Sequence, residues 1–181
     1  AGDNDILIDA GASNTTTIKN YMNKYNKNIT NLDNEVLICK NKIIDAICLS
    51  KRSICKEKGI NIKFDIKIPE IISIDDLDLC VIYGNILDNA IEACTRMKDQ
   101  SREKFIDIKS NILRGYLTIK IVNSKDEVSM KKNGKFVTLK KDKKNHGIGI
   151  YSVQKSVDKY NGQVILKDEK EVFTTGIIVK C

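Results

Sequence analysis

One stretch, GNILDNAIEAC at residues 84–94, constrains the fold of this chain more than any other. Advanced by about 100° per residue, it separates completely into an apolar side and a polar arc about 100° wide. The polar arc holds Asn85, Asp88, Asn89 and Glu92. This pattern predicts an amphipathic helix whose apolar side packs against a core.

The polar arc has two interpretations. Such an arc usually faces water, but exposed helix faces are then rich in Lys and Glu, which favour helices more than Asn does. Asn85 and Asn89 lie about one turn apart and offer neutral amide oxygens. Mg²⁺ prefers such hard oxygen ligands and is usually held by one or two protein groups plus substrate phosphates. The alternative is therefore a metal site.

A glycine-rich turn precedes another predicted helix in NHGIGIYSVQKSVDKYNG, residues 145–162. Gly147 and Gly149 allow the backbone to approach a phosphate, and the free N–H groups of a helix start attract anions. A simple turn is the alternative, because the chain has neither a P-loop nor a strand before this turn, as a dinucleotide-binding fingerprint requires.

The segment before this turn, residues 124–146, holds eight Lys against three acidic residues. A segment of this kind inside a compact domain is either disordered or a functional lid. Its lysines would neutralise phosphates held at the glycine turn. Taken together, the Asn pair, the glycine turn and the lysines predict a magnesium–nucleotide ligand.

Local patterns also predict the fold class. Alternating apolar and polar residues predict strands at 60–68, 105–112, 116–122, 163–168 and 172–181. Helical periodicity predicts helices within 16–58, from about 75 to 98, and from about 150 to 160. This order predicts an α/β (α+β) two-layer sandwich, in which a mixed sheet of about five strands carries helices on one face.

Caps and turns predict where these elements begin and end. The expected helix caps are Asn31 or Asp33 for a second helix within the first region, and Ser73 or Asp75 for the next helix. Gly59 is expected to end the first helical region, Arg114-Gly115 to form a hairpin-like turn, and Asn161-Gly162 to end the last helix.

We expect three parts in the chain. Residues 1–13 read as a tail or a cloning remnant, residues 14–58 as a helical segment, and residues 59–181 as the main domain. No apolar run approaches the roughly 18–20 residues that cross a bilayer, and no signal-peptide pattern opens the sequence. The six cysteines show no CxxC pairing, which predicts reduced, mostly buried thiols in a cytosolic protein.

The net charge of +7 suits a polyanionic partner, either a nucleic acid or a nucleotide phosphate. Nucleic-acid binding is disfavoured because the chain lacks Trp and shows neither RNA-binding nor zinc-finger signatures.

GNILDNAIEAC resembles the N box in the histidine-kinase branch of the GHKL ATPases, and NHGIGIYSVQKSVDKYNG resembles the second glycine box of that family. The pair resembles especially the sensor kinases of the accessory gene regulator type, which respond to peptide pheromones in quorum sensing. LDNEVLICKNKIIDA, upstream, resembles the helix that leads into their catalytic domain. The likeness covers roughly residues 30–181.

The resemblance implies a Bergerat-type ATP-binding fold in which Asn85 and Asn89 coordinate Mg²⁺ and residues 124–146 form the ATP lid. It implies that residues 14–58 hold a remnant of a dimerisation stem. Thr175 would help to seat the adenine, although an ordinary strand threonine is equally consistent. The residues expected around the phosphates are His146, Gly147, Ile148, Gly149 and Ile150.

The chain departs from the family pattern at the first glycine box. Asp-x-Gly-x-Gly is expected after a strand, and IVNSKDE stands there instead. Asn123 would take the place of the adenine-recognising aspartate, as a neutral hydrogen-bond acceptor. Its other interpretation is a turn residue that ends the strand.

A second departure concerns phosphoryl transfer. The family's phosphoacceptor histidine lies on an upstream helix and precedes an acidic residue, whereas the only histidine here, His146, precedes Gly147. We therefore read His146 as a turn or lid residue. Glu92 is a candidate base, with a solvated helix carboxylate as the alternative.

The resemblance thus implies a cytosolic catalytic fragment of a membrane-anchored sensor histidine kinase. It would bind Mg–ATP, phosphorylate a histidine outside this fragment, and fail to autophosphorylate alone. The implied partners are a phosphoacceptor helix of the same or a partner subunit, a response regulator, and a second copy joined through the N-terminal helices. The alternative is an interaction module whose nucleotide site is degenerate.

Overall fold

The computed structural model describes residues 19, 23, 37–126, 131–132, 135–136 and 148–181. Its main feature is a five-stranded mixed sheet with the strand order β1-β2-β3-β7-β6. β1 runs parallel to β2, and the other neighbouring strands are antiparallel. The strands are β1 (Asn61–Lys67), β2 (Phe105–Leu113), β3 (Tyr116–Ser124), β6 (Gln163–Asp168) and β7 (Val172–Lys180).

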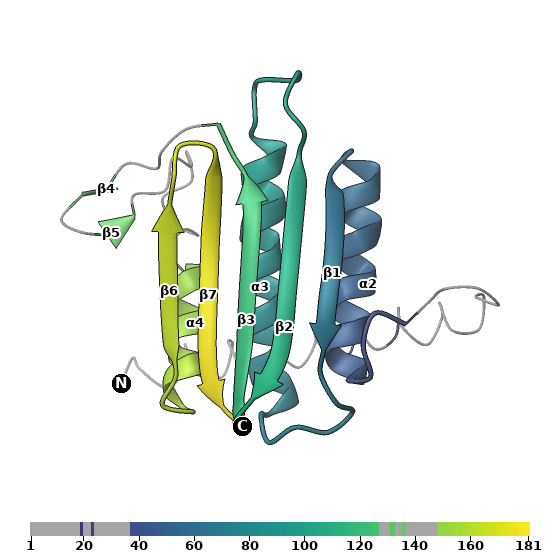
Figure 1. Cartoon of the computed structure of the whole chain (residues 1–181), viewed down its shortest axis with the longest axis vertical. Coiled ribbons are helices and arrows are strands. Elements are labelled where there is room, and N and C mark those ends of the chain that lie inside the picture. The colour runs from purple at the N-terminus through teal and green to yellow at the C-terminus, as the bar shows by residue number, and fades with distance from the viewer. Residues whose placement is uncertain (1–18, 20–22, 24–36, 127–130, 133–134, 137–147) are drawn as a thin grey trace, which may run out of the picture.

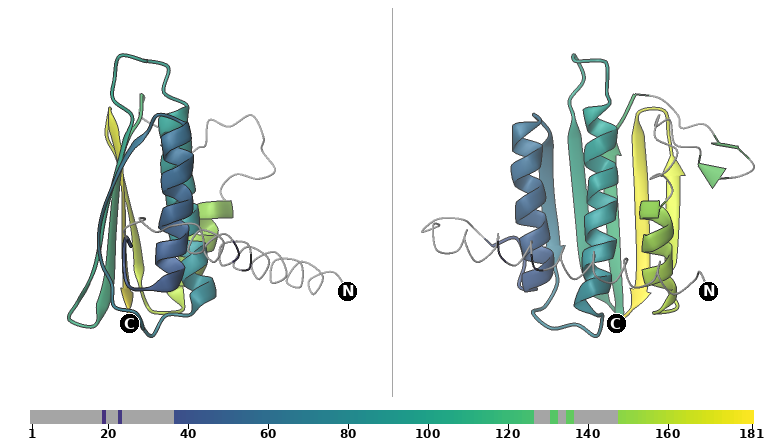
Figure 2. Two further views of the ribbon diagram at one scale, coloured as in Figure 1. Left: turned by 90° about the vertical axis from the view of Figure 1, so that its right-hand side faces the viewer. Right: turned by 180° about the vertical axis from the view of Figure 1, so that it is seen from behind.

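Three helices, α2 (Lys42–Glu57), α3 (Asp76–Thr95) and α4 (Ile148–Asp158), cover one face of this sheet. The side view shows the helices as one layer and the sheet as the other (Figure 2). This confirms the predicted two-layer sandwich. Its five strands lie within two residues of the ranges that alternation predicts, because one face of each strand is buried.

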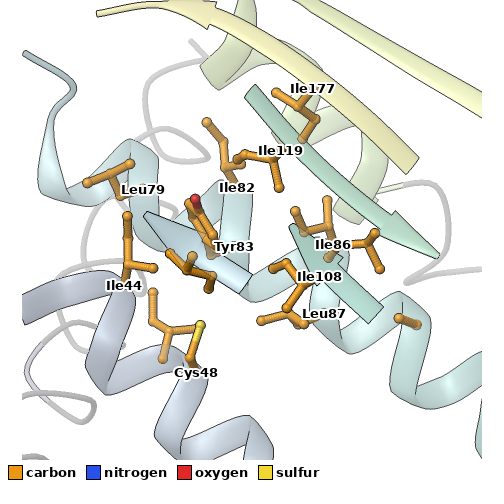
Figure 3. Packing of buried hydrophobic residues seen from close by; sticks show 14 of the residues in the cluster. Ile44, Cys48, Leu79, Ile82, Tyr83, Ile86, Leu87, Ile108, Ile119 and Ile177 are labelled. Atoms are coloured by element: carbon orange, nitrogen blue, oxygen red, sulfur yellow. The ribbon is translucent and has the colours of Figure 1, made fainter. Parts of the chain in front are cut away.

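The core lies between the two layers, and α3 is at its centre. Figure 3 shows this packing: apolar residues of α3 meet residues of α2 on one side and residues of the sheet on the other. Tyr83 is fully buried, and its hydroxyl shares a 2.6 Å hydrogen bond with Ser110 Oγ on β2. The polar end of this large ring is therefore satisfied inside the core.

Helix α2 begins later than the sequence predicts, because residues 37–41 are not helical. The Asp45 carboxylate accepts hydrogen bonds from the backbone N–H groups of Ile38 and Cys39, at 2.8 and 3.1 Å. Asn41 caps the helix by accepting from Ile44 N at 3.1 Å. Side chains thus use the local backbone donors, and the helix begins at Lys42.

The other predicted caps and turns can be checked in part. Asn31 and Asp33 lie outside the described residues. Asp75 caps α3 by accepting from Leu77 N at 2.8 Å, as predicted. Arg114 and Gly115 both have positive φ, 52° and 79°, which is the backbone of a tight hairpin turn between β2 and β3.

The core continues from the sheet into α2, which falls in the segment 14–58. The division of the chain at residue 58 stays a prediction. Of the expected lid, Ser124 ends β3, and β4 (Lys131–Lys132) pairs with β5 (Lys135–Phe136).

All six cysteines are free, and all but Cys181 are buried, as predicted. Burial raises the pKa of the Cys39 and Cys55 thiols to about 11. Within the described part of the chain, no helix combines the length and the apolar character that a bilayer span requires.

A buried carboxylate joins the start of α3 to the end of α4. Asp78 accepts hydrogen bonds from Lys159 Nζ and Tyr160 Oη, both at 2.8 Å. Burial alone would raise the pKa of Asp78, but hydrogen bonds from Lys159, Ser156 and Tyr160 outweigh it and lower the pKa below 3.8. The ionised form is therefore the one that the folded state favours.

We predict that Asp78→Asn lowers the free energy of unfolding at neutral pH by about 1.5–3 kcal/mol, the range for hydrogen bonds to charged groups. A lowered pKa in the folded state stabilises it at pH values above the ordinary pKa, and this contribution disappears as the pH falls through the folded-state value. The difference between wild type and variant in urea unfolding should therefore shrink below about pH 4. Asp76→Asn, an exposed change in the same turn, is the control; an equal effect there would contradict the assignment.

Candidate functional site

The polar arc of α3 lies as the sequence predicts. Asp88 and Asn89 are exposed, Asn85 and Glu92 are half-buried, and the apolar side of the same stretch is buried or half-buried. The apolar packing of α3 therefore fixes the direction of these four polar side chains. They form one continuous stripe along about two turns of helix.

Asn85 meets the glycine turn directly. Its Nδ2 donates to the backbone carbonyl of Val81 at 2.7 Å, which leaves its Oδ1 as the acceptor. A Cβ atom at Gly149 would lie 3.1 Å from that Oδ1 and 3.7 Å from the Asn85 Cγ. The first turn of α4 therefore lies so close to the Asn85 amide that a side chain at Gly149 would require the amide to shift by a few tenths of an ångström.

Asn89 lies one turn further along α3 and is exposed on the same stripe. Its neighbour Asp88 accepts from the Nζ of Lys51, on α2, at 2.6 Å. The Lys51 side chain is only 7% exposed. This ion pair fixes α2 against α3 beside the two asparagines.

Sequence reasoning missed Lys51. The available signal was its position on the apolar stripe of α2, between Cys48 and Cys55, where a lysine is out of place. A lysine on such a stripe is buried only with a partner, and the partner lies 37 residues away in the chain.

Glu92 lies at the end of the polar stripe, half-buried. Arg96, one turn further along, is its ion-pair partner at 3.8 Å. The carboxylate thus faces the same side of α3 as the asparagines, and a cation accompanies it.

Asn123 and Thr175 lie on neighbouring strands, and both are buried, with 3% and 8% exposed. In the register of β3 and β7, Thr175 pairs with Ile121 and so lies diagonally from Asn123. Both belong to the inward-facing set of their strands. Asn123 Nδ2 donates to the Ser124 carbonyl at 3.0 Å, which leaves its amide oxygen as an acceptor. The sheet thus brings these two predicted residues together.

The remaining predicted site residues lie in or before α4. Ile148 is the first residue of α4, and Ile150 follows Gly149 and is half-buried. His146 and Gly147 lie outside the described residues.

The side-chain oxygens of the polar stripe can be compared with the ligands that a metal ion prefers. No group of three or more His, Cys, Asp or Glu residues suited to a metal is present in the described part of the chain. The Asn85 Oδ1 is directed toward the start of α4, and Asn89 lies on the same side of α3. Two neutral oxygens suit a hard ion whose other ligands are phosphate oxygens and water, so the residues fit Mg²⁺.

A second feature missed by the sequence lies at the start of the lysine-rich segment. Lys125 and Asp168 form a 2.6 Å ion pair, with side chains 8% and 1% exposed. Arg102 donates to the Lys125 carbonyl at 3.2 Å and pairs with Asp126 at 3.4 Å. These contacts fix residues 125–126 at the end of β3.

Solved histidine kinases have a similar fold. The catalytic domain of histidine kinase ThkA, in a nucleotide-free form, is 15% identical with a TM-score of 0.59, over 77% of this chain and 91% of that one. AdeS from Acinetobacter baumannii is 12% identical with a TM-score of 0.57, over 96% and 78%. Full-length ShkA in complex with AMPPNP is 14% identical with a TM-score of 0.56, over 76% and 29%.

At sequence identities this low, the solved structures establish only the fold. The family is established by a comparison of sequences. A search of curated proteins finds no match. The sequence model of the GHKL domain matches residues 74–180, more than half of the chain, and this range contains both α3 and α4. The chain therefore belongs to the GHKL domain family and has the fold of the histidine kinase catalytic domains.

Proposed function

We propose that this chain is the ATP-binding catalytic domain of a sensor histidine kinase. Family membership and the fold support a domain of this kind. The observation that carries the proposal is the approach of Gly149 to the Asn85 amide, because it brings the candidate metal ligand to the helix start that would hold the phosphates. ShkA, which shares the fold, was solved with the ATP analogue AMPPNP.

Asn85 and Asn89 would hold Mg²⁺, and the start of α4 would hold the phosphates. The backbone N–H groups and the positive end of the α4 dipole attract anions there. When bound, magnesium supplies charge neutralisation of the phosphate oxygens. The lysines of 124–146 would add positive charge from the lid side.

The adenine would lie at the inward faces of β3 and β7. Asn123 offers an amide oxygen to the adenine amino group, and Thr175 offers a hydroxyl from the neighbouring strand. An amide acceptor carries no charge, so this contact is weaker than the one an aspartate would make.

The reaction would transfer the γ-phosphoryl group to a histidine on a helix outside this chain. A nitrogen of that imidazole forms the new P–N bond while the bond between the γ-phosphorus and the ADP oxygen breaks. The other imidazole N–H loses its proton, and Glu92 is the candidate base on this chain. Positioning and charge neutralisation account for most catalysis of this kind.

The upstream helix would belong to the same or a partner subunit, and a response regulator would receive the phosphoryl group. The resemblance of the two motifs supports assigning the chain to the accessory gene regulator type, the quorum-sensing branch. On that assignment the domain works in the cytoplasm, and the full-length kinase is anchored in the membrane.

Asn89→Ala should weaken Mg–ATP binding at least about tenfold, because a site with few protein ligands loses one of them. Isothermal titration calorimetry with and without EDTA measures nucleotide binding. Only the binding that requires Mg²⁺ should be weakened. Asn61→Ala, an exposed amide on β1, is the control. Normal binding by Asn89→Ala would contradict the ligand assignment, and no heat from the wild type at millimolar nucleotide would favour the interaction module.

Gly149→Ala should lower nucleotide affinity without lowering the thermal stability of the protein. The added methyl group would lie 3.1 Å from the Asn85 Oδ1 and displace the amide, so nucleotide affinity should fall several-fold. Alanine favours a helix over glycine by up to about 1 kcal/mol, so the melting temperature should not fall. Ser152→Ala, in the same helix, is the control. Unchanged affinity in Gly149→Ala would show that no ligand uses this approach.

The fragment should not phosphorylate itself. The chain has a single histidine, His146, and we assign it to the turn before α4 rather than to the acceptor helix. Incubation with labelled ATP should leave no acid-labile, base-stable phosphate on the protein. Phosphate that is lost in His146→Ala would show that this residue is the acceptor.

A further inference from the structure

The face of the sheet opposite the helices, here called the open sheet face, carries an uneven distribution of charge. Figure 1 is viewed from this side. The whole chain has 31 basic and 24 acidic residues, whereas the charged residues that face outward from the five strands are six lysines and two aspartates. They are Lys63, Lys67, Lys109, Lys120, Lys167, Lys180, Asp65 and Asp107.

Two of these lysines lie directly opposite each other. Lys109 on β2 pairs with Lys120 on β3 in the strand register, and both are exposed. Like charges opposite each other across a strand pair destabilise a sheet. Asp65 on β1 lies beside Lys109 in the register, but its carboxylate forms an ion pair with Lys67 at 3.3 Å. Within the described part of the chain, no carboxylate pairs with Lys109 or Lys120.

A depression in the same face lies beside these lysines, lined by residues of all five strands. Gly176 belongs to its lining and pairs with Lys120 in the register. A Cβ atom at Gly176 would lie 3.6 Å from the Ile165 Cβ, an ordinary contact. The packing of the protein therefore does not require glycine here, and the missing side chain keeps the depression open.

Apolar side chains surround the depression on its other side. Ile165 on β6 is 53% exposed and Ile178 on β7 is 38% exposed, and both belong to the lining. The lining therefore combines lysines of β2 and β3 with exposed isoleucines of β6 and β7, and Gly176 lies between Lys120 and Ile165 in the register. Apolar patches of this kind, bordered by charges, mark interaction surfaces.

We propose that the open sheet face docks an acidic, partly apolar polypeptide segment of a partner protein. Its carboxylates would lie between Lys109 and Lys120, and an apolar side chain would occupy the space over Gly176. A lipid bilayer is flat and would leave the depression unfilled. Single-stranded nucleic acids are bound with stacked aromatic rings and arginines, and the lining of the depression holds neither. The nucleotide site lies on the opposite face and is not needed for this role.

The probe is a fluorescein-labelled peptide of about eight alternating Glu and Leu residues, because five strands about 4.8 Å apart span roughly 20 Å. Fluorescence anisotropy should show binding to the wild type that weakens as salt rises. The double variant Lys109→Glu/Lys120→Glu should bind at least tenfold more weakly. The matched control is Lys56→Glu/Lys58→Glu, which changes the same net charge at the end of α2 and should keep the affinity.

Gly176→Val tests the depression without changing the charge. Valine suits a strand, and its Cβ meets only ordinary contacts here, so the melting temperature should hold while peptide affinity falls several-fold. Titration of each variant with Mg–ATP separates the docking proposal from the proposed nucleotide-binding function. If the protein does not bind Mg–ATP, the peptide measurements still test docking on the open sheet face. No peptide binding, equal losses in the α2 control, or tighter binding of phosphatidylglycerol vesicles or single-stranded DNA would overturn the docking proposal.

Discussion

The apolar side of α3 is the constraint on which the rest of this structure depends. It packs against α2, α4 and the middle strands of the sheet, with Tyr83 and Leu87 fully buried. A helix in such packing cannot rotate about its axis without exposing the core, so its polar stripe has one direction. That direction brings Asn85 against Gly149 at the start of α4. The core thus positions the candidate site.

Ion pairs between elements reinforce this arrangement at two points along α3. Asp78 in its first turn is joined to Lys159 after α4, and Asp88 in its second half is joined to Lys51 on α2. A buried charge is costly unless it is paired, so each link holds only while both elements stay in place. For Lys51 this means that movement of α2 would disturb the helix that carries both asparagines. The site is therefore connected to the element that leads in from the N-terminal side.

The two faces of the sheet are suited to different tasks. The inner face carries the core and brings Asn123 and Thr175 together on neighbouring strands. Among the described residues, no layer covers the open sheet face and no carboxylate forms an ion pair with its two opposed lysines. A sheet with one covered face can vary its other face at little cost to folding, because few core contacts depend on it. Binding at one face need not interfere with nucleotide binding at the other.

The amino-acid sequence by itself determined the strands, the amphipathic α3, the Asp75 cap and the hairpin turn, because the periods of 2 and 3.6 and the chemistry of turns are local. It also placed the two asparagines on one stripe. Only the tertiary structure decided that Gly149 lies against Asn85, that Lys51 pairs with Asp88, and that α2 begins at Lys42. These features depend on which elements, distant in the sequence, pack together. The periodicity of apolar residues within one element predicts which of its sides is buried, but it does not identify the element that packs against that side.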